Sequence, residues 1–453
     1  MADTFVNTPI NDTLVGEAAS PSLSGERKAP WSGVRGWSSK GFLALLDQGL
    51  ISGVNFLMSI LLARRLLPAQ YGTYALAFEV FLFLSVVYAA LVLEPLSVFG
   101  SSVYRKSPRE YLGVLLRIHG VMAAGIFVVL GVSVWVVESV SPGRGLAPAL
   151  AGVAIAAPCV LLFWLARRGF YVELAPRQAV LGSLVYFVVV MGGLLIVCRF
   201  EILSPLVAFL LMAAGAAATA PLMLARLKPL LKPGLLAFRT SEVIRRHWGY
   251  GRWALGSAVA IWFSGAIFYP LVSGFRGLGD AGALKALMNF SSPVGQAFAA
   301  MSLLSLPYAA RIHHEDGSGG SQRLVWKLTA IYAGGTAFYW LIVVLLRHPI
   351  VSHLYAGKYS GITGLIPWVA VGSVLRISAT AQAVTLRAMH SPALVFVAYV
   401  AASAVAVLVG VPCTWAFGLR GAVFTLVLSS AVALAVALAL VHRRSTFARF
   451  FKP

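Results

Sequence analysis

The amino-acid sequence predicts an all-α integral membrane protein with twelve transmembrane helices arranged as two six-helix lobes. The first observation is composition: 59% of the 453 residues are hydrophobic and 11% are charged, whereas a soluble domain carries about 25% charged residues. The second is a series of apolar runs, most of them near the roughly 20 residues that a helix needs to cross a bilayer. The third is a basic segment, 226–252, that divides these runs into two groups of six.

The segments follow one another in a simple order. A polar tail, 1–40, is expected to be disordered and cytoplasmic. An N-terminal lobe, 41–225, holds spans one to six, the cytoplasmic linker 226–252 connects it to a C-terminal lobe, 253–442, with spans seven to twelve, and a cytoplasmic tail, 443–453, follows. The first two spans form a hairpin within 41–100, and the other ten are expected at 111–137, 146–170, 179–198, 203–225, 253–275, 281–310, 324–346, 362–386, 394–417 and 421–441.

Lys and Arg residues are divided unevenly between the two sides of the expected membrane. With both termini in the cytoplasm, 26 of the 36 Lys and Arg residues lie on that side and 9 on the other, while Arg376 lies within a span. Because short cytoplasmic loops carry the excess of positive charge, this bias predicts cytoplasmic termini. It also explains the net charge of +21, so membrane lipids are expected partners and nucleic acid is not.

The first hairpin contains polar side chains at membrane depth: Asp47, Gln48, Asn55, Glu79 and Glu94. At 100° per residue, Gln48 and Asn55 share one stripe of the first helix, and Glu79 and Glu94 lie within about 60° of each other on the second. Unsatisfied polar groups in hydrocarbon cost several kcal/mol. The hairpin therefore predicts a bundle with a polar or wet interior.

Two groups in the C-terminal half are candidates for binding a substrate. Arg376 lies near the middle of span ten with Thr380 on its face, and its planar guanidinium suits phosphate oxygens. A structural pairing of Arg376 with one of the buried acids is equally open. The second group is a stripe in span eight whose spacing favours lining the cavity over helix–helix contact, with Pro293 beside it as a candidate kink; its members are Lys285, Asn289, Ser292 and Gln296.

The acids Asp47, Glu79 and Glu94 are candidates for ion coupling or gating, and the alternative is that they neutralise Arg376 or Lys285. No phosphate-binding GxxxxGK[ST] loop, zinc motif or catalytic triad stands out, and the three cysteines lie singly in apolar runs. We therefore expect a transporter without cofactor or metal, and not an enzyme.

The hairpin resembles the polysaccharide flippases, the O-antigen and exopolysaccharide (Wzx-type) family within the superfamily of multidrug, oligosaccharidyl-lipid and polysaccharide exporters. The residues that carry the likeness are Leu45-Leu46-Asp47-Gln48-Gly49, Ser52, Asn55-Phe56, Ala63-Arg64 and Tyr71-Gly72. In the second half it rests on Tyr250-Gly251-Arg252-Trp253, the Gly-rich turn before Lys285, Asn289 to Gln296, Leu306-Pro307 and Leu354 to Tyr359. The likeness covers 41 to about 386.

The resemblance implies two lobes around a central cavity and export of an undecaprenyl-pyrophosphate-linked oligosaccharide across the bacterial inner membrane. Polysaccharide polymerase and other assembly proteins are then expected partners, and a monomer is the default. Two rivals remain: a multidrug cation antiporter, which would need a net acidic pocket, and an integral-membrane polymerase or ligase, which would need a long catalytic outer loop.

The topology has a direct test. A reporter fused after Arg144 should lie in the periplasm and one fused after Arg239 in the cytoplasm, because the charge bias fixes both positions. Alkaline phosphatase and green fluorescent protein fusions read out the two sides, and a reversed result at either position would break the arrangement of six plus six spans.

Overall fold

The computed structural model of the chain describes residues 32–143, 145–231, 239–388 and 392–450. These residues form helices and connecting turns, with no strand among them. Eleven of the described helical segments are long and apolar enough to cross a membrane. The expected all-α membrane fold of two lobes is confirmed.

The N-lobe is built from the first seven α-helices and a π-helical segment. Four of its helices begin at a proline, which suits the first turn because its missing N–H would have no partner there and its φ is already helical. The second span is continuous from α2 through the π-helix to α3. The elements are α1 Ser32–Arg65, α2 Pro68–Tyr88, η1 Ala89–Leu93, α3 Glu94–Ser101, α4 Pro108–Val140, α5 Leu146–Val172, α6 Pro176–Arg199 and α7 Pro205–Leu227.

The C-lobe contains the remaining helices. Its spans are interrupted more often than those of the N-lobe, at 267, 277 and 409 among other places. The elements are α8 Thr240–Ala266, α9 Phe268–Arg276, α10 Leu278–Asn289, α11 Ser292–Leu345, α12 Arg347–Tyr355, η3 Ser360–Leu365, α13 Ile366–Ala388, α14 Pro392–Leu408, α15 Gly410–Phe417 and α16 Leu419–Phe450.

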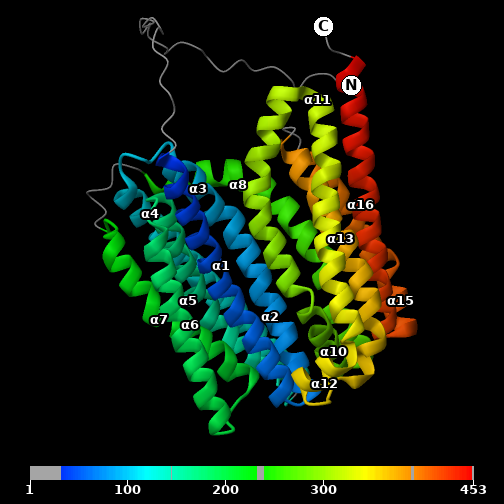
Figure 1. Cartoon of the computed structure of the whole chain (residues 1–453). Coiled ribbons are helices and arrows are strands. Elements are labelled where there is room, and N and C mark those ends of the chain that lie inside the picture. The colour runs from blue at the N-terminus through cyan, green and yellow to red at the C-terminus, as the bar shows by residue number, and fades with distance from the viewer. Residues whose placement is uncertain (1–31, 144, 232–238, 389–391, 451–453) are drawn as a thin grey trace, which may run out of the picture.

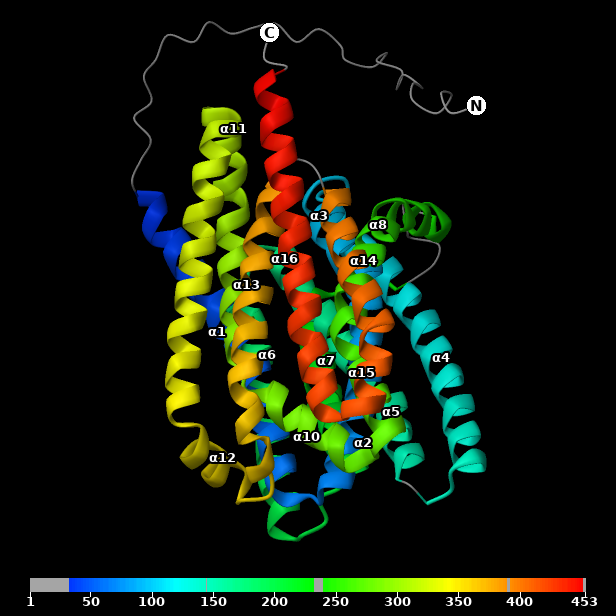
Figure 2. The same cartoon turned by 90° about the vertical axis from the view of Figure 1, so that its right-hand side faces the viewer.

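The expected span eight is divided between two helices. Helix α10 ends at Asn289 and α11 begins at Ser292, with Pro293 in its first turn, so the expected kink is a break. Helix α11 then rises, folds back on itself and descends to α12, as both views show (Figures 1 and 2). The first arm of α11 completes the span that α10 begins. This span accounts for the twelfth expected crossing, which is not among the eleven segments selected by length and hydropathy.

Both tails and the linker contain more helix than we expected. Residues 32–40 belong to α1, 443–450 belong to α16, and 240–252 of the linker belong to α8. The rest of the N-terminal tail, 1–31, lies outside the described residues. The bilayer-spanning helices thus continue past the apolar segments on the side of the termini.

The two lobes approach each other closely at the end of the bundle away from the termini (Figure 1). Helix α2 crosses α10 there with a glycine on each side. A Cβ atom on Gly72 would lie 1.7 Å from the carbonyl oxygen of Leu278, and one on Gly282 would lie 2.4 Å from the carbonyl oxygen of Pro68. Only glycine permits this backbone contact.

Polar contacts reinforce the same end. The Arg64 guanidinium donates a hydrogen bond of 2.7 Å to the His353 carbonyl, and the Lys358 ammonium donates one of 2.9 Å to the Leu66 carbonyl. Each joins the hairpin turn of the N-lobe to the α12 region of the C-lobe. The two bonds therefore hold the lobes together at the end of the bundle away from the termini.

Substituting Gly72 with alanine should push the lobes apart at this end, because the added methyl meets backbone. Overpacking costs about 1–3 kcal/mol, enough to shift a two-state population by roughly 5- to 150-fold. Spin labels at Ala69 and Gly361, both exposed, would report the change as longer distances. Gly274→Ala is the matched control because nothing lies within 4 Å of its added Cβ, and a Gly72→Ala distance distribution like that of the control would contradict the prediction.

Candidate functional site

A cavity of about 580 Å³ lies between the lobes. The N-lobe contributes Glu79 and Leu82 to its wall, and the other lining residues come from α8 to α16 of the C-lobe. Six of the ten residues expected at the site line it: Glu79, Lys285, Asn289, Gln296, Arg376 and Thr380. The cavity is therefore mostly a C-lobe surface closed on one side by α2.

An ion pair joins the lobes across this cavity. The Lys285 ammonium on α10 lies 3.5 Å from a carboxylate oxygen of Glu79 on α2, and both residues are 9% exposed. The ammonium also lies 4.4 Å from the centre of the Phe78 ring, a favourable cation–π contact. The structure thus brings Glu79 together with Lys285, one of the pairings that the sequence left open.

Arg376 differs from the buried charges Asp47, Glu79 and Lys285. Its side chain is exposed to the cavity, with a guanidinium nitrogen placed 3.5 Å from where a Cβ on Gly265 would lie. It takes part in none of the ion pairs found among the described residues. Because Glu79 is engaged by Lys285, the cavity wall carries one excess positive charge, at Arg376.

The four residues of the expected span-eight stripe all line the cavity, although a helix break separates Asn289 from Ser292. Gln296 is exposed, whereas Asn289 is 3% exposed. The Asn289 amide donates to the Tyr71 hydroxyl at 2.9 Å, and its carbonyl accepts from the Ser59 hydroxyl at 2.9 Å. Asn289 therefore binds the two lobes together at the bottom of the cavity.

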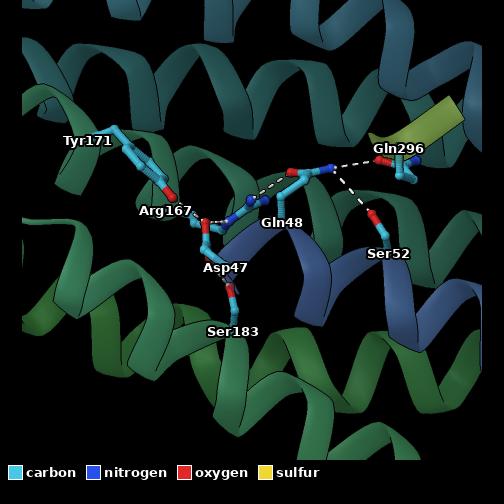
Figure 3. Close-up of polar contacts among 7 residues, drawn as sticks. All are labelled: Asp47, Gln48, Ser52, Arg167, Tyr171, Ser183 and Gln296. Carbon is cyan, nitrogen blue, oxygen red and sulfur yellow. Dashed lines mark hydrogen bonds and ion pairs between the residues drawn. The ribbon is translucent and has the colours of Figure 1, made fainter. Parts of the chain in front are cut away.

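Asp47 lies in a separate cluster inside the N-lobe (Figure 3). Its carboxylate is fully buried and accepts hydrogen bonds from the Arg167 guanidinium at 2.7 Å, the Tyr171 hydroxyl at 2.6 Å and the Ser183 hydroxyl. The sequence left open an ion pair between Asp47 and Arg376, and that pairing is wrong because Asp47 is paired with Arg167. Asp47 does not line the cavity.

Gln48 connects the Asp47 cluster to the C-lobe. Its carbonyl accepts from Arg167 at 3.1 Å, and its amide donates to the Gln296 carbonyl at 3.1 Å and to the Ser52 hydroxyl at 3.4 Å. Figure 3 shows this chain running from α5 through α1 to α11. Gln48 therefore faces the opposite lobe.

Two expected site residues lie elsewhere. Asn55 is half-buried and Glu94 is exposed, and neither lines the cavity. The shared face expected for Glu79 and Glu94 assumed 100° per residue throughout. The π-helix Ala89–Leu93 has a wider turn, which changes the direction of every side chain beyond it.

Several residues at these sites were not identified from the sequence. Arg167 falls within the expected span 146–170, and a charged residue within a span is expected to be buried. The count of Lys and Arg on the two sides of the membrane nevertheless treated Arg167 as a loop residue. The aromatic cavity residues Trp262, Tyr269 and Tyr399 gave no local signal. Their roles depend on which helices meet, and that information is not local.

Neither a family model nor a curated relative matches the sequence. Solved structures do match its fold. A multidrug resistance MATE family transporter of the MOP superfamily matches in its inward-facing conformation with a TM-score of 0.76 at 12% identity, over 90% of this chain and 96% of that one. Its outward-facing conformation matches with a TM-score of 0.66 at 12% identity, over 91% and 96%.

The lipid II flippase MurJ, in an inward closed conformation, matches with a TM-score of 0.68 at 12% identity, over 89% of this chain and 87% of that one. At these identities the likeness concerns the fold alone. The resemblance of the sequence to polysaccharide flippases is compatible with this fold and stays a prediction. The chain has the two-lobe membrane fold shared by MATE transporters and the MurJ flippase of the MOP superfamily.

Proposed function

We propose that this protein is a flippase that moves an undecaprenyl-pyrophosphate-linked oligosaccharide from the inner to the outer leaflet of the bacterial inner membrane, for surface polysaccharide synthesis. The two lobes would alternate in opening the cavity to either side. The observation that carries the proposal is Arg376, a guanidinium exposed in the cavity and outside every ion pair of the described residues. Such a group is suited to a phosphate.

The other lining residues suit the sugar part of such a substrate. Tyr269, Tyr399 and Trp262 offer aromatic faces, and Gln296 and Ser292 offer hydrogen-bonding groups. A cavity of about 580 Å³ falls within the range of roughly 300–1,000 Å³ for small-molecule sites. It would hold the pyrophosphate and the first sugars while the prenyl chain stays in lipid.

The charge of the cavity weighs against the multidrug cation antiporter. A site for an organic cation needs an available carboxylate, but Glu79 is already engaged by Lys285. A polymerase or ligase would need a catalytic outer domain. The connection between the expected spans nine and ten, 347–361, which the charge bias places on the outer side, consists of the short helix α12 and the start of η3.

Arg376 gives the most direct test. Because a hydrogen bond to a charged group contributes about 1.5–3 kcal/mol, Arg376→Ala should weaken binding of undecaprenyl pyrophosphate to the purified protein by roughly 10- to 150-fold. Arg376→Lys should recover only part of this affinity, because a point charge replaces a bidentate fork. Uncharged undecaprenol should bind both variants as it binds the wild type.

The control is Arg420→Ala, which removes an exposed arginine of the same lobe outside the cavity. In a strain lacking the gene, this control should restore export and Arg376→Ala should leave lipid-linked oligosaccharide on the inner leaflet. Normal export by Arg376→Ala at normal protein level would exclude the phosphate-binding role.

The interlobe ion pair is our candidate for energy coupling. Protonation of Glu79 would free Lys285 for a substrate anion and remove one link between the lobes, so proton and substrate binding would be coupled. In vesicles with an imposed pH gradient, Glu79→Gln should abolish the effect of the gradient on transport. Glu94→Gln, which alters an exposed acid outside the cavity wall, should respond as the wild type does. A full response by Glu79→Gln would remove Glu79 as the coupling group and leave Asp47 as the next candidate.

A further inference from the structure

The first half of α8 is a helical segment outside the membrane span. The apolar span begins at Ala254, so about four turns of helix, 240–253, precede it. In both views this segment lies crosswise to the long helices, at the end of the bundle where the termini lie (Figures 1 and 2). The rest of α8 turns into the bundle.

One face of this segment is fixed to the N-lobe. Val243, His247 and Gly251 are buried and lie one turn apart. The Nδ1–H of His247 donates to the Leu91 carbonyl at 2.9 Å, and its Nε2 accepts from the Tyr111 hydroxyl at 2.6 Å. Burial lowers the pKa of His247, which favours the neutral ring that this pair of bonds requires.

The contact lies against the π-helix of the second span. A Cβ atom on Gly251 would lie 2.7 Å from the Ala90 carbonyl oxygen, so the segment rests directly on backbone. The π-helix has a wider turn than an α-helix. His247 donates to the Leu91 carbonyl within this π-helix, so this face is a specific docking contact and not a loose linker.

The adjacent face combines exposed apolar and basic side chains. Ile244 and Trp248 are 49% and 54% exposed and lie one turn apart. Arg245 and Arg252, both exposed, follow them on the helix surface, all four falling within about 100° of arc. A linker that ran through water would have no reason to present tryptophan and isoleucine on its outer face.

The region around this segment is strongly basic. Between 226 and 253 there are seven Lys and Arg residues and a single acid, Glu242, which is paired with Arg246 at 3.0 Å. Arg245 takes part in none of the ion pairs of the described residues. The exposed face therefore presents net positive charge beside an apolar edge.

We propose that the first half of α8, residues 240–252, is an interfacial helix that binds the anionic phospholipids of the leaflet on the side of the termini. Arg252 is two residues from the start of the span, so the segment lies at the level of the headgroups. There Trp248 and Ile244 reach the hydrocarbon boundary and the arginines reach phosphate. Charge complementarity selects anionic lipid as the occupant of this face.

The depth of the exposed face provides the first test. In a background with Cys159, Cys198 and Cys413 replaced, nitroxide labels at Trp248→Cys and Gly249→Cys are compared in vesicles of phosphatidylcholine with and without phosphatidylglycerol. Gly249 is the matched site because it is the next residue in the helix, is exposed, and would have no atom within 4 Å of an added Cβ. We expect the label at 248 to favour collision with oxygen and the label at 249 with a water-soluble nickel chelate.

Two results would overturn the proposal at this step. Equal access of nickel chelate to both labels would mean that the segment lies in water. A label at 248 shielded from both reagents would mean that protein covers the face, as in a dimer.

The preference for anionic lipid provides the second test. The label at 248 should move deeper as phosphatidylglycerol is added, and Arg245→Gln should raise the fraction needed for half of this change by about fivefold, since one basic residue near the surface contributes about 1 kcal/mol. Arg105→Gln removes an exposed charge in the turn between α3 and α4 and should leave the midpoint unchanged. A label depth independent of phosphatidylglycerol, or equal shifts in both variants, would refute specific binding by this face.

Discussion

Hydrocarbon offers a polar side chain no hydrogen-bond partner, and this constraint organises the interior of the protein. Asp47 is surrounded by three donors inside the N-lobe, and Glu79 is neutralised by Lys285 across the lobes. Asn289 uses both ends of its amide to join the lobes. Against this background Arg376, which lines the cavity and takes part in no ion pair of the described residues, is a departure from the rule, and a charge of this kind within a membrane span is a candidate for function.

Contacts between the lobes are of two kinds. The glycine crossing of α2 and α10 brings backbone against backbone, so it depends on shape and tolerates no side chain. The Glu79–Lys285 pair and the Asn289 bonds depend on charge and hydrogen bonding, which water or a bound anion can replace. Contacts of the first kind fix how α2 and α10 meet, and contacts of the second kind involve side chains that also line the cavity.

The sequence was sufficient for the fold class and for six of the cavity residues because both follow from periodicity and hydropathy. The polar stripe around Lys285 lines the cavity as its spacing predicts. The partner of Asp47 was missed because Arg167 comes from another helix, 120 positions away. Glu94 lies outside the cavity wall, beyond a π-helical segment that changes the phase of the helix and that the expected regular α-helix did not include.

The reciprocal glycine crossing also constrains how this protein can change over evolutionary time. Gly72 contacts the backbone at Leu278, and Gly282 contacts the backbone at Pro68. Each glycine therefore leaves room for the backbone of the other lobe. A larger residue at one site could be accepted only after α2 and α10 had moved apart, and the second glycine would then no longer be needed. The two positions should therefore covary in homologous chains, keeping small residues at both or at neither.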